Sequence, residues 1–117
     1  MFFLHYSEEK NRIYIELRGE LSEAEFNAYK NNIIDLIDGA RPGFTVLADL
    51  SLCDRSVIEN SDNFNVIREY GAKRGFKANA LVLGEDAYKT YTSALKGNNN
   101  NIYYTKDEAD SYLDTLQ

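Results

Sequence analysis

Side chains that could do chemistry gather in one short stretch near the middle of the chain. Asp49, Ser51, Cys53, Asp54 and Ser56 all lie between positions 49 and 56. Carboxylates beside hydroxyl groups can bind a hard cation, a thiol at a helix start can act as a nucleophile, and a serine there can accept a phosphoryl group. These three chemistries need different neighbours, so the surrounding sequence decides among them.

The sequence offers no clear base for a Cys53 nucleophile and no ligand pattern for a cation site. A reactive Cys53 thiolate needs a base, and the single histidine, His5, lies in an early strand where we expect a partly buried, structural side chain. Asp49, Asp54 and Asp62 are irregularly spaced, and no glycine-bearing calcium loop surrounds them. Walker and dinucleotide-binding glycine motifs are also missing. We therefore expect a protein that is not an enzyme and that binds no metal or cofactor.

The element that positions this stretch is an apolar run from Phe44 to Leu50, with Ser51 directly after it. Such a nearly continuous run is typical of a buried parallel strand. In open α/β sheets, ligands and regulatory groups lie beyond the carboxyl ends of the strands. We therefore expect Asp49, Ser51, Asp54 and Ser56 to lie at the working edge of a sheet.

Two β-rich runs, Phe2–Tyr6 and Arg12–Leu17, precede this strand and predict a hairpin. Ser22 then lies three residues before Glu25, which is the spacing of a capping box at a helix start. Apolar residues recur at helical spacing after that box. The predicted buried face of this helix consists of Phe26, Tyr29, Ile33 and Ile37.

The second half of the chain alternates helices with short apolar runs. Ser56 and Glu59 form a second capping box that predicts a helix ending near Gly75, and Ser61 offers a later start. The remaining predicted elements are a strand over Ala78–Leu83, a helix over Asp86–Leu95 closed by Gly97 and the Asn98–Asn101 turn, a strand over Ile102–Tyr104, and a helix capped by Thr105 and Glu108.

The resulting order, ββαβαβαβα, places the chain in the α/β class. It predicts a mixed, mostly parallel five-stranded sheet packed with four helices through right-handed connections. A length of 117 residues is typical of one domain with one core. We therefore expect a single domain over residues 1–117.

Charge argues against two classes of partner. The net charge is -6 and the sequence pI is about 4.7, whereas nucleic acids and anionic membranes attract basic surfaces. The basic residues that do cluster fall around the end of a predicted helix, where cations complement the helix dipole without any ligand. These residues are Arg68, Lys73, Arg74 and Lys77.

The sequence also bears on location. Met1–Leu4 is apolar but has no basic flank and is followed at once by polar residues, so it lacks a signal-peptide pattern. No later segment approaches the roughly 20 apolar residues of a membrane span. One cysteine can form no internal disulfide, which fits a reducing compartment. We expect a cytoplasmic protein with no membrane insertion.

The element order, with a strand ending in Asp49-Leu50-Ser51 and a helix soon after it, resembles the STAS domain (sulfate transporter and anti-sigma-factor antagonist) over nearly the whole chain. The closing stretch, residues 102–113, is similar to the SpoIIAA-like branch, whose members often end in a short strand, an acidic cap, Glu-Ala and an aromatic-Leu pair. The resemblance implies a non-catalytic interaction or regulatory module whose partner is another protein, such as a kinase or a regulator.

In the anti-sigma antagonists, the helix after the central strand opens with Asp-Ser-Ser/Thr-Gly, and a partner kinase phosphorylates the second hydroxyl residue. Asp54 and Ser56 fit this motif here, whereas Arg55 replaces the first serine and Val57 replaces the glycine. The resemblance implies a regulatory phosphosite at Ser56, with Ser51 as a second choice. The implied interaction edge is Asp49, Asp54, Arg55, Ser56 and Val57.

Phosphate on Ser56 would place negative charge at a helix N-terminus and would repel an acidic partner surface. A plain helix-capping role is the simpler interpretation of the same serine.

Aromatic content supports an alternative function. Nine tyrosines and six phenylalanines suit a pocket for a small apolar or amphipathic ligand, although their helical spacing also fits ordinary packing against a sheet. The unpaired edge of the first hairpin would in addition allow a homodimer. The aromatic residues concerned are Phe26, Tyr29, Phe64, Tyr88 and Tyr112.

Overall fold

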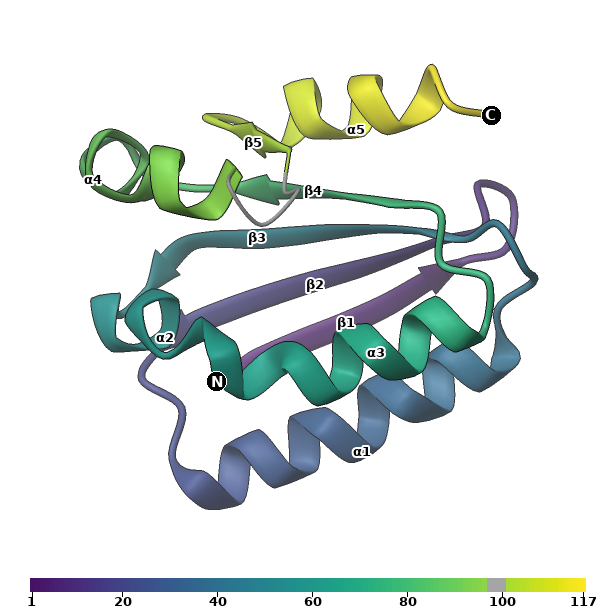
Figure 1. The fold of residues 1–117 in the computed structure, drawn as a ribbon, viewed down its shortest axis with the longest axis horizontal. Coiled ribbons are helices and arrows are strands. Elements are labelled where there is room, and N and C mark those ends of the chain that lie inside the picture. The colour runs from purple at the N-terminus through teal and green to yellow at the C-terminus, as the bar shows by residue number, and fades with distance from the viewer. Residues whose placement is uncertain (97–100) are drawn as a thin grey trace.

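The computed structural model describes residues 1–96 and 101–117 (Figure 1). The strands are β1 (Phe2–Ser7), β2 (Arg12–Gly19), β3 (Thr45–Cys53), β4 (Ala78–Val82) and β5 (Ile102–Tyr103). The helices are α1 (Glu23–Gly39), α2 (Arg55–Glu59), α3 (Asn65–Lys73), α4 (Glu85–Lys96) and α5 (Lys106–Asp114), with a 3₁₀ turn, η1 (Ser61–Phe64), between α2 and α3.

The sheet has the order β1-β2-β3-β4-β5, with β1 antiparallel to β2 and every later pair parallel. Each parallel connection leads to the neighbouring strand, and right-handed crossovers therefore put α1 and α3 on the same face. Figure 1 shows these two helices on one side of the sheet and α5 on the other. The predicted α/β class and mixed five-stranded sheet are confirmed.

Two predicted helix starts are confirmed by their caps. The Ser22 side chain accepts a hydrogen bond from the Glu25 backbone N–H at 3.1 Å, and the Thr105 side chain accepts one from the Glu108 N–H at 3.2 Å. Tyr29, together with Ile33 and Ile37, is buried as the helical spacing predicts.

The helix predicted from Ser56 to Gly75 is wrong, because the chain breaks into α2, η1 and α3. Asp54, rather than Ser56, caps α2: its Oδ1 accepts the Ser56 backbone N–H at 2.9 Å. Aspartate caps a helix as well as serine does, so the earlier residue fixes the start. Residues 1–96 and 101–117 therefore contain five α-helices instead of the four expected.

Other boundaries shift less. β3 continues to Cys53, three residues beyond the predicted Leu50. The predicted stop at Gly97 and the Asn98–Asn100 part of the asparagine turn lie outside the described residues. Within those residues, no helix combines the length and apolar character needed to cross a lipid bilayer.

Strand alternation divides the core between the two faces of the sheet. The face under α1 and α3 holds the larger apolar cluster, which includes Ile13, Ile15, Leu17, Ile33, Phe44 and Ile67. The opposite face holds a smaller cluster of Leu47, Ala80, Val82, Ala109 and Leu113 beneath α5.

Candidate functional site

The last part of β3 carries polar side chains at the predicted edge. Asp49 Oδ1 accepts hydrogen bonds from the Ser51 backbone N–H at 3.0 Å and from the Ser51 hydroxyl at 2.6 Å. Ser51 is exposed, and Leu52 beside it is 59% exposed. This end of the strand therefore presents both a hydroxyl group and an apolar side chain to solvent.

The other edge residues do not all face outward. Asp54 and Arg55 are exposed and Ser56 is half-buried, but the Val57 side chain is only 7% exposed and belongs to the core. Hydrogen bonds from the Ser56 backbone and side chain lower the pKa of Asp54. Four of the five predicted edge residues are thus accessible to some degree, and Val57 instead supports the helix from inside.

A hollow of about 290 Å³ lies between the start of α1 and α2, with Ser56 on its wall. Its lining mixes polar residues such as Ser22 and Asn60 with Phe26 and Phe64.

The structure places Cys53 and His5 far apart. Burial raises the pKa of the Cys53 thiol to about 11, and its Sγ donates to the Leu50 carbonyl oxygen at 3.1 Å. His5 pairs with Tyr14 on β2, and Tyr14 pairs with Leu47, six residues before Cys53 on β3. Six strand residues span roughly 20 Å. The thiol is therefore protonated at neutral pH and has no histidine beside it.

The expectation of a partly buried His5 is wrong. The side chain is exposed, since it lies on the sheet face that α5 leaves uncovered, and it stacks on Tyr14 with ring centroids 6.1 Å apart. In the part of the chain that the structure describes, no group of three or more histidine, cysteine, aspartate or glutamate side chains could hold a metal ion. Asp49, Asp54 and Asp62 therefore form no such group.

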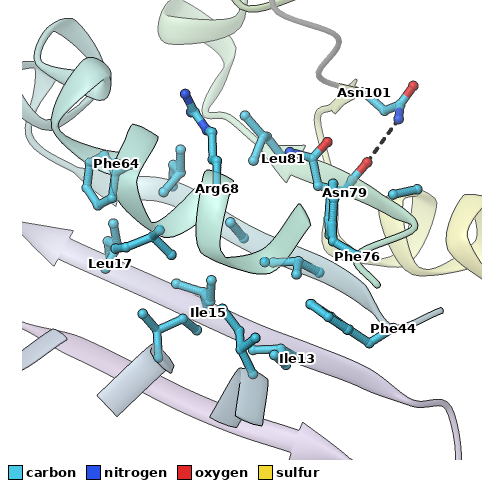
Figure 2. Close-up of a pocket in the computed structure, with 18 of the residues that line it drawn as sticks. Ile13, Ile15, Leu17, Phe44, Phe64, Arg68, Phe76, Asn79, Leu81 and Asn101 are labelled. Carbon is cyan, nitrogen blue, oxygen red and sulfur yellow. Dashed lines mark hydrogen bonds between the residues drawn. The ribbon is translucent and has the colours of Figure 1, made fainter. Parts of the chain in front are cut away.

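A larger concave feature than the hollow at Ser56 lies between the sheet and the helices α1 and α3. It is a cavity of about 510 Å³, shown in Figure 2. We call it the apolar cavity, because its walls are mostly aliphatic and aromatic side chains. They include Ile13, Ile15 and Leu17 of β2, Ile33 and Ile37 of α1, and Ile67 of α3.

Small residues leave this space open. Ala48 of β3 and Gly71 of α3 both line the apolar cavity where larger side chains would fill it. A Cβ on Gly71 would stand 3.7 Å from Phe44 Cζ and 3.9 Å from Ile37 Cδ1, so even an added methyl group meets only ordinary contacts. Protein interiors contain few voids larger than a water molecule, whereas ligand pockets span about 300–1,000 Å³. The apolar cavity has the size of a ligand pocket.

One side of the apolar cavity is polar. We call this side the polar mouth and define it by Arg68, Lys77, Asn79 and Asn101, which all line the cavity. Figure 2 shows Arg68, Asn79 and Asn101 on one side, away from Ile13, Ile15 and Leu17. The Asn101 side-chain amide donates to the Asn79 carbonyl oxygen at 2.9 Å and so ties the start of β5 to β4.

Tyr29 adds a polar atom to an otherwise apolar wall. Its side chain is 4% exposed and packs edge-on against Phe2 and Phe64, at centroid distances of 5.7 Å each. Burial raises the pKa of its hydroxyl. Among the residues that the structure describes, no hydrogen-bond partner of this hydroxyl is found.

Of the aromatic residues that the sequence suggested for a ligand pocket, three line the apolar cavity: Tyr29, Phe64 and Tyr112. Phe26 and Tyr88 do not line it.

Sequence reasoning grouped Arg68 and Lys77 with Lys73 and Arg74 as cations that need no ligand, and it did not connect them with Asn79 and Asn101, which lie in and just before later strands. No protein-family model matches this chain, and no curated protein matches it in sequence.

Proposed function

We propose that this protein binds a small apolar or amphipathic ligand and does not catalyse a reaction on it. The observation that carries the proposal is the apolar cavity of about 510 Å³ between the sheet and the helices α1 and α3. The raised pKa of Cys53 and the distance between Cys53 and His5 add support, because they argue against an activated Cys53–His5 pair.

Energetics favour an occupied cavity. At about 24 cal/mol per Å³, a dry void of this size would cost on the order of 12 kcal/mol, which is comparable to the roughly 5–15 kcal/mol that stabilises a whole domain. Water restores little of this loss where the walls offer few polar partners. An apolar chain would restore the missing contacts and would stabilise the fold by mass action.

The first test is mass spectrometry of the protein isolated from its own cells, under native and then denaturing conditions. A mass lost only on denaturation would identify a bound ligand. A second test titrates the ligand-free protein with straight-chain alcohols of increasing length by calorimetry. Each buried methylene contributes about 0.8 kcal/mol, so affinity should rise roughly fourfold per carbon until the cavity is full.

A blocking variant locates the binding site. Ala48→Leu adds three carbons inside the cavity and should weaken decanol binding by more than about tenfold. Ala80→Leu is the matched control, since Ala80 is buried on the opposite face and does not line the cavity. If no alcohol binds, or if Ala48→Leu and Ala80→Leu bind decanol as tightly as the wild type, the proposal is wrong.

A second candidate function is the protein-interaction module that the STAS resemblance implies. The observation that favours it is the exposed end of β3 and start of α2, where Leu52, Ser51, Asp54 and Arg55 are all exposed. In this proposal a cytoplasmic kinase or regulator contacts the edge, and phosphate on Ser56 or Ser51 alters the contact. The same mass spectra test it, because a phosphoryl mass would survive denaturation and could be mapped to either serine. An unmodified chain would count against the switch.

A homodimer through β1 is compatible with either function. β1 is an edge strand of the sheet, so its outer side has no neighbouring strand within residues 1–96 and 101–117. Such an edge can pair with a second copy of the chain.

A further inference from the structure

We propose that the ligand of the apolar cavity is a single-chain amphiphile with an anionic head group, held by Arg68 and Lys77 at the polar mouth. This inference rests on the proposed ligand-binding function and specifies the ligand class. The apolar chain would lie among the aliphatic walls, and the head group would lie at the polar mouth.

Segregation of the lining is the first argument. The residues of β2 and α1 that line the cavity are apolar apart from the Tyr29 hydroxyl, whereas the four polar-mouth residues come from α3, the segment before β4, β4 itself and the segment before β5. Figure 2 shows the labelled polar side chains away from the β2 isoleucines. A wholly apolar ligand would make no hydrogen bonds with the polar mouth, and a wholly polar ligand would make no apolar contacts with the aliphatic walls.

Charge is the second argument. Some cations of the described residues form ion pairs: Lys10, Arg12, Arg18, Arg74 and Lys89. Arg68 and Lys77 form no ion pair with any described residue. Arg68 donates from Nη1 to the neutral Asn65 side chain at 2.9 Å, and Lys77 donates to the Leu116 carbonyl oxygen. Two cations without carboxylate partners at the opening of an apolar cavity favour an anion there.

Donor geometry is the third argument. The Asn65 contact uses one of the five N–H donors of the Arg68 guanidinium, and an ammonium group such as that of Lys77 has three. These contacts use only part of the donors of each side chain and leave others for a carboxylate or a phosphate. Both side chains are exposed, so their replacement should not disturb the core.

The test compares probes that share one chain and differ in the head group: decanoate, decanol and decylammonium. Each is titrated into the ligand-free full chain by calorimetry at low salt, because salt screens exposed charges. Decanoate should bind roughly tenfold more tightly than decanol, as a charge-assisted hydrogen bond allows. Decylammonium should bind most weakly. Decyl phosphate in a parallel titration tells which anionic head group is preferred.

Variants assign the preference to residues. Arg68→Gln/Lys77→Gln should bind decanoate no better than decanol. The matched control is Lys73→Gln/Lys106→Gln, which changes the net charge equally at two exposed lysines that do not line the cavity. This control should keep the preference for decanoate.

The outcomes separate the two proposals. If decanol binds but decanoate has no advantage, or if the advantage survives in Arg68→Gln/Lys77→Gln, the anionic head group is wrong and the ligand-binding function stands. If none of the probes binds, both proposals fail. The anionic amphiphile is supported if Arg68→Gln/Lys77→Gln loses the preference for decanoate and Lys73→Gln/Lys106→Gln keeps it.

Discussion

The two faces of the sheet are closed by different kinds of contact. Beneath α1 and α3, apolar side chains surround a cavity of about 510 Å³. Beneath α5, the apolar contacts are joined by a buried arginine and two aspartates. Apolar contacts are non-directional and leave the spacing between layers loosely set, whereas hydrogen bonds demand fixed distances and angles.

The contacts under α5 form what we call the charged cluster: Lys10, Arg12, Tyr14, Asp110 and Asp114. Arg12 is 0% exposed and donates to Asp110, to Asp114 at 2.9 Å and, through Nε, to Thr45 Oγ1 at 2.9 Å. Asp110 also accepts from the Tyr14 hydroxyl at 2.7 Å and from Lys10 at 3.1 Å. The charged cluster therefore fixes α5 against β2.

The difference in contacts between the two faces indicates which face can hold a ligand. A face held by directional contacts has little freedom to admit a guest, because any displacement breaks several bonds at once. A face held by apolar contacts can exchange protein neighbours for ligand neighbours at small cost. Departures from full packing are expected at functional sites, and here the departure lies beneath α1 and α3.

The first prediction concerns the charged cluster beneath α5, where we expect the greatest loss of stability. Asp110→Ala should lower the free energy of unfolding by about 3 kcal/mol, because it removes a partner from the buried charge of Arg12. Arg12 Nη2 already lacks a hydrogen-bond partner among the described residues, which leaves no spare contact. Urea-induced unfolding measures the change. Asp107→Ala, an exposed carboxylate on the same helix, is the control, and an equal loss in both variants would contradict a special role for the cluster.

The next effect compares the two faces directly with the same substitution. Ala80→Leu should cost about 1–3 kcal/mol, since Ala80 is fully buried beneath α5 and three added carbons overpack that layer. Ala48→Leu should leave stability unchanged or raise it, because the added carbons enter the apolar cavity. Urea unfolding of the ligand-free proteins measures both. Equal losses at the two sites would mean that the two faces do not differ in packing.

The third effect concerns pH. Burial raises the pKa of Asp110, but hydrogen bonds from Tyr14, Lys10 and Arg12 outweigh it, and the pKa lies below its ordinary value of 3.8. Such a carboxylate contributes stability that is full above its unfolded-state pKa and is lost as pH falls through its folded-state pKa.

The unfolding free energy of the wild type should therefore fall more steeply below about pH 4 than that of Asp110→Asn. Thermal unfolding across this pH range provides the measurement. Asp54→Asn serves as the control on another element, because its pKa is also lowered but it lies outside the charged cluster. If the unfolding free energy of the wild type and of Asp110→Asn fell equally with pH, Asp110 would not contribute to the loss of stability in acid.

The parts of the fold that could be predicted depend on local signals. Ser22 and Thr105 were identified as caps because a hydroxyl three residues before a glutamate satisfies backbone N–H groups within one turn. The same pattern at Ser56 failed, because Asp54 lies two residues earlier and takes the capping role first. Local rules therefore predict an element reliably only where one candidate cap is present.

The candidate site was harder to predict, since it is a property of volumes. Helical spacing predicts that Tyr29 and Ile33 face the sheet, but it does not tell whether the facing strands fill the space between. That depends on small residues such as Ala48 and Gly71, which lie on different elements. The Arg12–Asp110 pair was likewise invisible, because 98 positions separate its members.

The smallest expected effect measures how much room the cavity face offers. Gly71→Ala should raise the free energy of unfolding by about 0.5–1 kcal/mol, because alanine favours the helix over glycine and its methyl group meets Phe76 Cβ at 3.8 Å without a clash. Gly39→Ala in α1 is the matched control, since a Cβ there meets nothing within 4 Å and reports helix propensity alone. Urea unfolding of both variants separates propensity from packing. A gain at Gly71 that exceeds the gain at Gly39 would come from new contacts within the cavity, whereas a loss at Gly71 would mean that this wall is already tightly packed.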